Sequence, residues 1–239
     1  MTDRGRYVVG ADACPYGWCG TRIDGDEVTI ELFQTFENLQ DSFSEARRIL
    51  VDIPVGLSDT SRRRCDEKSR GLLGCRGNSV FFSPSSQAVK CDEYDRANET
   101  HRKSVGYGLS QQAFHIREKI LEVQETVGDI YDGIVRESHP ELCFAALNGQ
   151  PIAYPKSSPE GRALRLQLLE REIRDAESMY RDVREKFPLK EVRRDDILDS
   201  IVLAVAATSD KLTTVPEKPD PDEPRMYFPH FDVPSGPDL

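Results

Sequence analysis

The chain has 239 residues, 38% of them hydrophobic and 31% charged, which suits one large domain with a very polar surface. Its 42 Asp and Glu residues outnumber its 32 Lys and Arg residues, and the net charge of −10 argues against non-specific nucleic-acid binding driven by charge alone. The polar first residues lead into no apolar segment, and no stretch is long enough to span a bilayer. We therefore expect no signal peptide, no membrane contact and a cytoplasmic location.

The six cysteines are scattered along the chain without a Cys-x-x-Cys pair, which indicates reduced thiols. A zinc site built on Cys14 and Cys19 would lack the usual ligand spacing. Arginine outnumbers lysine and the surface is acidic, as in proteins from a high-salt cytosol. A GC-rich genome gives the same arginine bias, so both interpretations stay open.

The first predicted element is a hairpin whose first strand leads to an acid. Residues 7–9 form an apolar run that continues to Asp12, a turn follows at Pro15 and Gly17, and residues 18–23 form the second strand. Alternating residues 28–33 predict a third antiparallel strand.

A second strand that carries an acid follows through a crossover. Residues 36–48 have apolar side chains at helical spacing and predict a helix, and the apolar run 49–56 contains Asp52. A strand joined to another through a helix is expected to pair with it in parallel. Two neighbouring strands would then each deliver one aspartate to the same end of a sheet.

The segment 58–107 is long and polar, and we predict an ordered insertion because it contains the apolar run 80–82. Further predicted elements are a helix over 111–127, a strand over 132–137, a helix start at His139-Pro-Glu141, a long charged helix over 159–187 and an apolar helix over 195–207. The predicted domain spans residues 1–212. The Pro- and Asp-rich tail 213–239 is expected to be extended, with 226–228 as an edge strand or packed on the core.

These elements predict an α/β fold with a mixed five-stranded sheet in the order 3-2-1-4-5, strand 2 antiparallel, flanked by helices and carrying the long insertion after strand 4. The first turn of the last helix would then face the aspartates of strands 1 and 4. Clustered carboxylates repel one another and need a cation, and oxygen ligands favour Mg²⁺ or Mn²⁺. The expected metal ligands are Asp12, Asp52, Asp196 and Asp199, and Glu137 is expected to join them in catalysis.

This layout resembles the ribonuclease H-like superfamily, and its Asp196-Ile-Leu-Asp199 pair resembles that of the RuvC-type resolvases. The chain is more closely similar to the DUF429 family, predicted to be ribonuclease H-like nucleases. The motifs that carry this resemblance are Gly10-Ala-Asp-Ala-Cys-Pro-Tyr-Gly-Trp18, Asp52-Ile-Pro-Val-Gly-Leu57, Arg64-Cys-Asp66, Arg70, Leu73-Gly74, Arg76, Ser79-Val-Phe81, Pro84, Glu137-Ser-His-Pro-Glu141 and Asp195-Asp-Ile-Leu-Asp199.

The resemblance implies a metal-dependent nuclease or phosphodiesterase whose partner is nucleic acid or another phosphodiester. Two ions about 4 Å apart are the usual arrangement for such hydrolysis. Basic side chains are expected to bind the phosphate, and the candidates are Arg64, Arg70, Arg76 and Lys156.

Structural explanations compete with these roles. Aspartate favours turns, so Asp12 and Asp52 suit their positions without catalysis, and Asp196 complements a helix dipole. Glu137 and Glu141 compete for one place in the site, and His139 is either a general base or a hydrogen-bonded loop residue.

Two other functions compete with hydrolysis. One is an ATP-binding phosphotransferase of the actin and sugar-kinase type, although the glycine-rich phosphate loops are thin here. The other is a non-catalytic binding module on the same fold. A dinucleotide-binding fold is excluded because no Gly-x-Gly-x-x-Gly follows the first strand.

Overall fold

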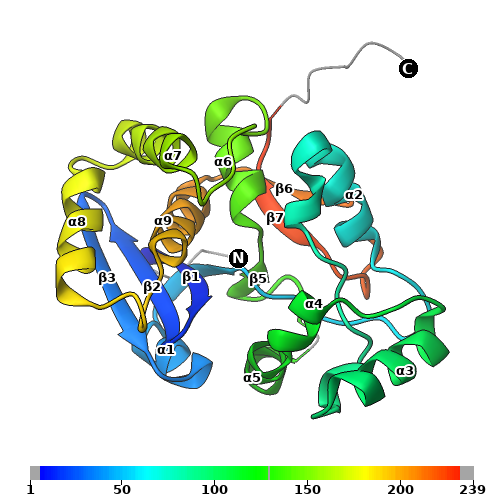
Figure 1. The fold of residues 1–239 in the computed structure, drawn as a ribbon. Coiled ribbons are helices and arrows are strands. Elements are labelled where there is room, and N and C mark those ends of the chain that lie inside the picture. The colour runs from blue at the N-terminus through cyan, green and yellow to red at the C-terminus, as the bar shows by residue number, and fades with distance from the viewer. Residues whose placement is uncertain (1–5, 129, 232–239) are drawn as a thin grey trace, which may run out of the picture.

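The computed structural model describes residues 6–128 and 130–231 (Figure 1). Its five-stranded sheet consists of β1 (Tyr7–Cys14), β2 (Gly17–Asp24), β3 (Glu27–Phe33), β4 (Ala46–Val51) and β5 (Val135–Glu137). The strand order is β3-β2-β1-β4-β5; β2 is antiparallel to β1 and β3, while β1, β4 and β5 are parallel. The predicted α/β fold and strand order are confirmed.

The helices are α1 (Phe36–Ser42), α2 (Arg64–Leu73), α3 (Tyr94–Val105), α4 (Gln111–His115), α5 (Arg117–Val127), α6 (Pro140–Asn148), α7 (Pro159–Glu172), α8 (Ala176–Lys186) and α9 (Arg194–Thr208), with the short 3-10 helices η1 (Gly74–Ser79) and η2 (Ala88–Lys90). Helices lie on both faces of the sheet (Figure 1). On one face α9 crosses β1, β2 and β4, and α6, α7 and α8 pack around it. The other face is covered by α1 and α5.

The strand alternation of β1 divides its side chains between these two layers. Val8 belongs to the core beneath α9, whereas Val9 and Ala11 belong to the core beneath α1 and α5. Gly10 faces α9 so closely that a Cβ atom on it would lie 2.2 Å from the backbone nitrogen of Ala204. A residue without a side chain is therefore required where α9 crosses β1, and this close crossing holds the start of α9 near the end of the strand.

The crossover between β3 and β4 is shorter than the predicted helix over 36–48. Helix α1 ends at Ser42, and β4 already begins at Ala46. The reason is tertiary, because Arg48 pairs with Val8 in the sheet and donates hydrogen bonds to the carbonyls of Ala207 and Ser209 at 3.0 and 2.9 Å. These hydrogen bonds to the end of α9 hold Arg48 in a strand.

Two predicted helices are each broken in two. The helix predicted over 111–127 breaks at Ile116, because Phe114 packs in a small core with α3 while Ile120 packs under the sheet. The helix predicted over 159–187 breaks where Ile173 turns into the core and Asp175 adopts a left-handed backbone with φ of 61°. Both breaks let the two halves bury different faces.

The segment predicted as an insertion, 58–107, holds α2, η1, η2 and α3. The first part of the predicted tail folds into a second sheet of β6 (Leu212–Val215) and β7 (Met226–Pro229), which are antiparallel. The side chains of Met226, Tyr227 and Phe228 are buried. The remaining tail, 232–239, lies outside the described residues, as do residues 1–5 of the predicted domain. Of the helices described, none combines the length and apolarity that crossing a membrane requires.

Candidate functional site

The structure brings four predicted aspartates to one end of the sheet. Asp12 lies near the end of β1 and Asp52 directly follows β4, its parallel neighbour. The amide of Asp52 donates to the carbonyl of Ala11 at 3.1 Å, so the two strand ends are held together. Asp196 and Asp199 lie in the first turns of α9, three residues apart and therefore on one face of the helix.

The charges of these carboxylates interact in a buried setting. Burial raises the pKa of Asp12, and the negative charges of the other three aspartates raise it further. The pKa values of Asp196 and Asp199 rise to about 6, with burial as the main cause in both. A group of acids that titrates this far above the usual range favours a bound cation or a bound proton over bare charge.

Two of the four acids accept hydrogen bonds from other described residues. Asp196 accepts a hydrogen bond from the backbone amide of Arg193 at 2.8 Å and so caps α9. Asp199 accepts one from the ammonium of Lys156 at 2.8 Å through its Oδ2 atom. The carboxylate of Asp52 accepts no hydrogen bond from the described residues, which leaves it open to a ligand.

A fifth acid, Glu141, joins this group from the start of α6. Its Oε1 atom accepts a hydrogen bond from Arg165 at 2.6 Å, while its Oε2 atom is buried and without a partner in the described residues. Asp199 likewise has one oxygen, Oδ1, that is buried and unpartnered there. Both residues line a cavity of about 240 Å³ together with Asp52, Lys156 and Arg76. Buried oxygens without a donor are costly, so they indicate a place for a cation.

The donors at this cavity suit a hard divalent cation. They include three carboxylates and, among the described lining residues, no cysteine, as Mg²⁺ and Mn²⁺ prefer. His139 lines the cavity but is occupied, because its Nδ1 atom accepts the backbone amide of Glu141 at 3.2 Å. This hydrogen bond caps α6 and agrees with the interpretation of His139 as a structural loop residue.

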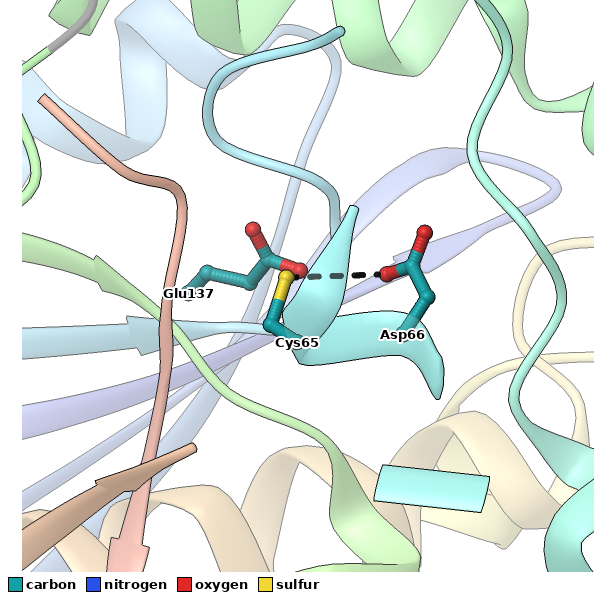
Figure 2. A group of neighbouring side chains, drawn as sticks. All are labelled: Cys65, Asp66 and Glu137. Atoms are coloured by element: carbon teal, nitrogen blue, oxygen red, sulfur yellow. Dashed lines mark hydrogen bonds between the residues drawn. The ribbon is translucent and has the colours of Figure 1, made fainter. Parts of the chain in front are cut away.

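A second group of possible ligands consists of other residues, two of which line a small pocket together with Asp52. Cys65, Asp66 and Glu137 place one ligand atom each within 4.8 Å of one another, a spacing that suits a metal ion (Figure 2). All three are buried, and burial raises the pKa of the Cys65 thiol and that of Glu137, the latter to about 7. In spacing alone, this cluster is a candidate metal site.

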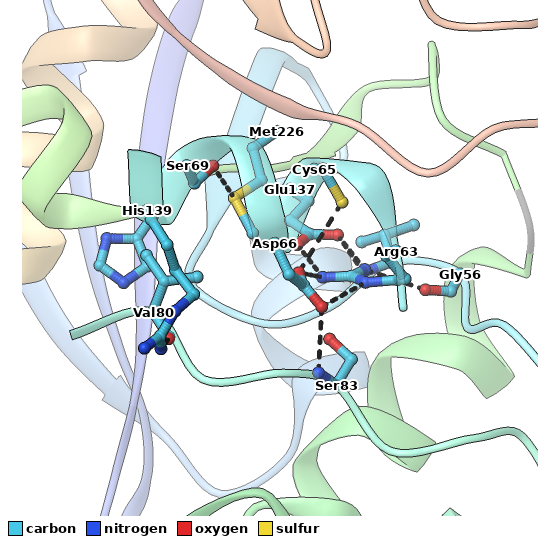
Figure 3. Close-up of polar contacts among 12 residues, drawn as sticks. Gly56, Arg63, Cys65, Asp66, Ser69, Val80, Ser83, Glu137, His139 and Met226 are labelled. Atoms are coloured by element: carbon cyan, nitrogen blue, oxygen red, sulfur yellow. Dashed lines mark hydrogen bonds and ion pairs between the residues drawn. The ribbon is translucent and has the colours of Figure 1, made fainter. Parts of the chain in front are cut away.

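A guanidinium already lies among these carboxylates, as Figure 3 shows. Arg63 donates to Asp66 at 2.5 and 3.2 Å, to Glu137 at 2.7 and 2.9 Å, and to the carbonyl of Gly56 at 3.0 Å. The amides of Val55 and Ser83 complete the network, at 2.7 Å to Glu137 and 3.0 Å to Asp66. Four hydrogen bonds from one cation satisfy both acids, so we assign this cluster to structural support for α2 and the strand ends.

The predicted residues therefore divide into two groups. Glu137 lies beside Arg63, whereas Glu141 lies beside the aspartates. The sequence alone had not decided which of these two glutamates would join the aspartates. Arg64 pairs with Glu223 at 2.9 Å, and Arg70 donates to the carbonyl of Val80 at 2.5 Å. Of the predicted phosphate contacts, the two that line the cavity are Arg76 and Lys156.

No feature of the sequence indicated a role for Arg165. It lies in a charged helix where an arginine is expected at the surface, yet it is fully buried and holds Glu141. No motif marks it. The proline at the start of α6 was the available signal for Glu141, because Pro140 fixes this acid in the first helical turn.

The pKa values of Asp196 and Asp199 predict a pH-dependent response to metal. Their folded pKa of about 6 exceeds the ordinary 3.8, so the folded chain binds more protons than the unfolded chain between these values. Their contribution to stability therefore falls as pH rises through this window. A divalent cation replaces the protons, and we expect Mn²⁺ to raise the melting temperature more at about pH 7.5 than at about pH 5. An equal rise at both pH values, measured by differential scanning fluorimetry, would contradict this assignment.

The fold and the site define an α/β protein with a buried carboxylate cluster at the ends of its parallel strands. The family model described as a protein of unknown function, DUF429, matches residues 10–221, and the chain belongs to this family. No curated protein and no solved structure matches the chain.

Proposed function

We propose that the chain is a ribonuclease H-like, metal-dependent phosphodiesterase that hydrolyses nucleic acid. The observation that carries the proposal is the pair of buried, unpartnered oxygens, Glu141 Oε2 and Asp199 Oδ1, in one cavity with Asp52. In the Arg63 cluster, which we assign to structural support, the carboxylates accept hydrogen bonds from the guanidinium. Glu141 Oε2 and Asp199 Oδ1 have no such compensation among the described residues, and burying them in this way is unfavourable. A bound divalent cation compensates them.

Mg²⁺ or Mn²⁺ would be held by Asp52, Glu141 and Asp199, with the charge of Asp12 acting from the adjacent strand. Such an ion supplies an activated water and neutralises charge that develops on the phosphate. The strand ends and the start of α9 are rigid elements, so the carboxylates are positioned before substrate arrives.

Arg76 is our candidate for the phosphate contact. It comes from η1, lines the same cavity, and its Nε atom is buried without a partner among residues 6–128 and 130–231. A guanidinium that lines a cation site and has an unused N–H donor suits a phosphodiester. The phosphodiester carries the opposite charge to the arginine and would bridge the arginine and the metal ion. The acidic chain as a whole would then rely on this local contact rather than on its overall charge.

Hydrolysis assays test the proposal. The wild-type protein is incubated with labelled single-stranded and duplex DNA and RNA, and with bis(p-nitrophenyl) phosphate, in the presence of Mg²⁺ or Mn²⁺ or an excess of chelator. We expect cleavage with either metal and its loss with the chelator. Cleavage that survives the chelator, or the absence of cleavage of every substrate by metal-loaded protein, would contradict the proposed function.

A further inference from the structure

Lys156 places a fixed positive charge inside the carboxylate cluster. It belongs to the loop before α7, and its ammonium lies 2.8 Å from Asp199 Oδ2 and 3.4 Å from Asp195. The side chain is 42% exposed and lines the cavity, so its tip lies between solvent and the acids.

The oxygens that remain are divided one per residue. Asp199 uses Oδ2 for Lys156 and keeps Oδ1 free, and Glu141 uses Oε1 for Arg165 and keeps Oε2 free. Asp196 gives its Oδ2 atom to the cap of α9. A pair of ions about 4 Å apart needs carboxylates that present oxygens to both ions. Here one of the two oxygens of Asp199 already faces the ammonium of Lys156.

We infer that Lys156 occupies the position of a second cation, so that this site holds a single divalent ion. The inference rests on the proposed function, because it concerns the metal site on which that function depends. An ammonium has three donors, and its contacts with Asp199 and Asp195 leave one for a phosphate oxygen of the substrate. Lys156 would thus neutralise charge at the phosphate on the side that the metal ion does not reach.

The stoichiometry of Mn²⁺ binding tests the inference. Bound Mn²⁺ is counted by the loss of the free-ion electron paramagnetic resonance signal in titrations of full-length protein, together with calorimetry. We expect the wild type to bind one ion per chain at this site. Lys156→Met removes the charge but keeps most of the side-chain volume, and we expect it to bind two ions, with spin coupling between them.

Two further variants make the result specific. Lys156→Arg keeps the charge and is expected to bind one ion. Lys103→Met removes an exposed lysine that pairs with Glu99 at 2.6 Å on α3, away from the cavity lining, and is also expected to bind one ion. Melting curves confirm that each variant is folded.

The outcomes separate the inference from the proposed function. Two coupled ions in the wild type, or one ion with unchanged affinity in Lys156→Met, would overturn the inference and leave the metal-dependent function standing. A wild type that binds no Mn²⁺ would overturn the proposed function, and the inference would fall with it.

Discussion

Asp52→Asn is expected to lower the affinity for Mn²⁺ by at least about 100-fold, because even changes to groups behind a metal ligand cost 10–100-fold. The substitution is nearly isosteric, and the Asp52 carboxylate accepts no hydrogen bond from the described residues, so the change breaks no hydrogen bond among them. Metal-dependent phosphodiester hydrolysis should fall with the affinity. Calorimetry gives the affinity, and the hydrolysis assay gives the activity at a metal concentration that does not saturate the variant.

Asp26→Asn is the matched control. The same change is made at an exposed turn between β2 and β3, and no effect on metal affinity or activity is expected. Because partial burial disfavours the charge of Asp52 and Glu141 repels it, the metal-free Asp52→Asn protein should be at least as stable as the wild type. If Asp52→Asn binds Mn²⁺ with wild-type affinity, Asp52 is not a ligand of the metal site.

Arg63→Met is expected to lower the free energy of unfolding by about 3–5 kcal/mol, because it leaves Asp66 and Glu137 buried without their cation. The guanidinium makes five hydrogen bonds, and the residue is 4% exposed. Urea denaturation followed by circular dichroism measures the loss. Protonation of Glu137 limits the damage at low pH, since burial already raises its pKa to about 7.

The neighbouring Arg64→Met provides the comparison. Arg64 has the same side chain, but it is 50% exposed and pairs with Glu223 at the surface, so a loss of at most about 1 kcal/mol is expected. Equal effects of the two substitutions would contradict the structural role of Arg63. Destabilisation by a chelator that is as strong in Asp52→Asn as in the wild type would instead favour a metal ion among Cys65, Asp66 and Glu137.

The sheet and two acidic positions could be predicted from the sequence. An apolar run leading to Asp12, a crossover, and a second run leading to Asp52 fix two parallel neighbours whose ends coincide, and the structure has this arrangement. Helix ends were harder to predict, because local periodicity continues across Ile116 and Ile173 while tertiary packing breaks the helices there. Helix propensity does not indicate against which part of the core each half of a helix will pack.

The choice between Glu137 and Glu141 depended on strand register. Glu137 pairs with Val51, and side chains paired across a sheet point to the same face. Val51 packs beneath α5, so Glu137 points away from the face of α9. Asp12 alternates with Ala11 and therefore points toward α9, where Glu141 also lies. A three-residue strand carries too little pattern for this register to be predicted from sequence.

The anomalous scattering of Mn²⁺ in crystals of the wild-type protein tests the central claim most directly, since it places the ion without regard to substrate. We predict a peak in the cavity between Asp52, Glu141 and Asp199, beside the ammonium of Lys156. A peak among Cys65, Asp66 and Glu137 with none in that cavity, or no peak in metal-saturated crystals, would contradict the assignment of this carboxylate cluster as the metal site.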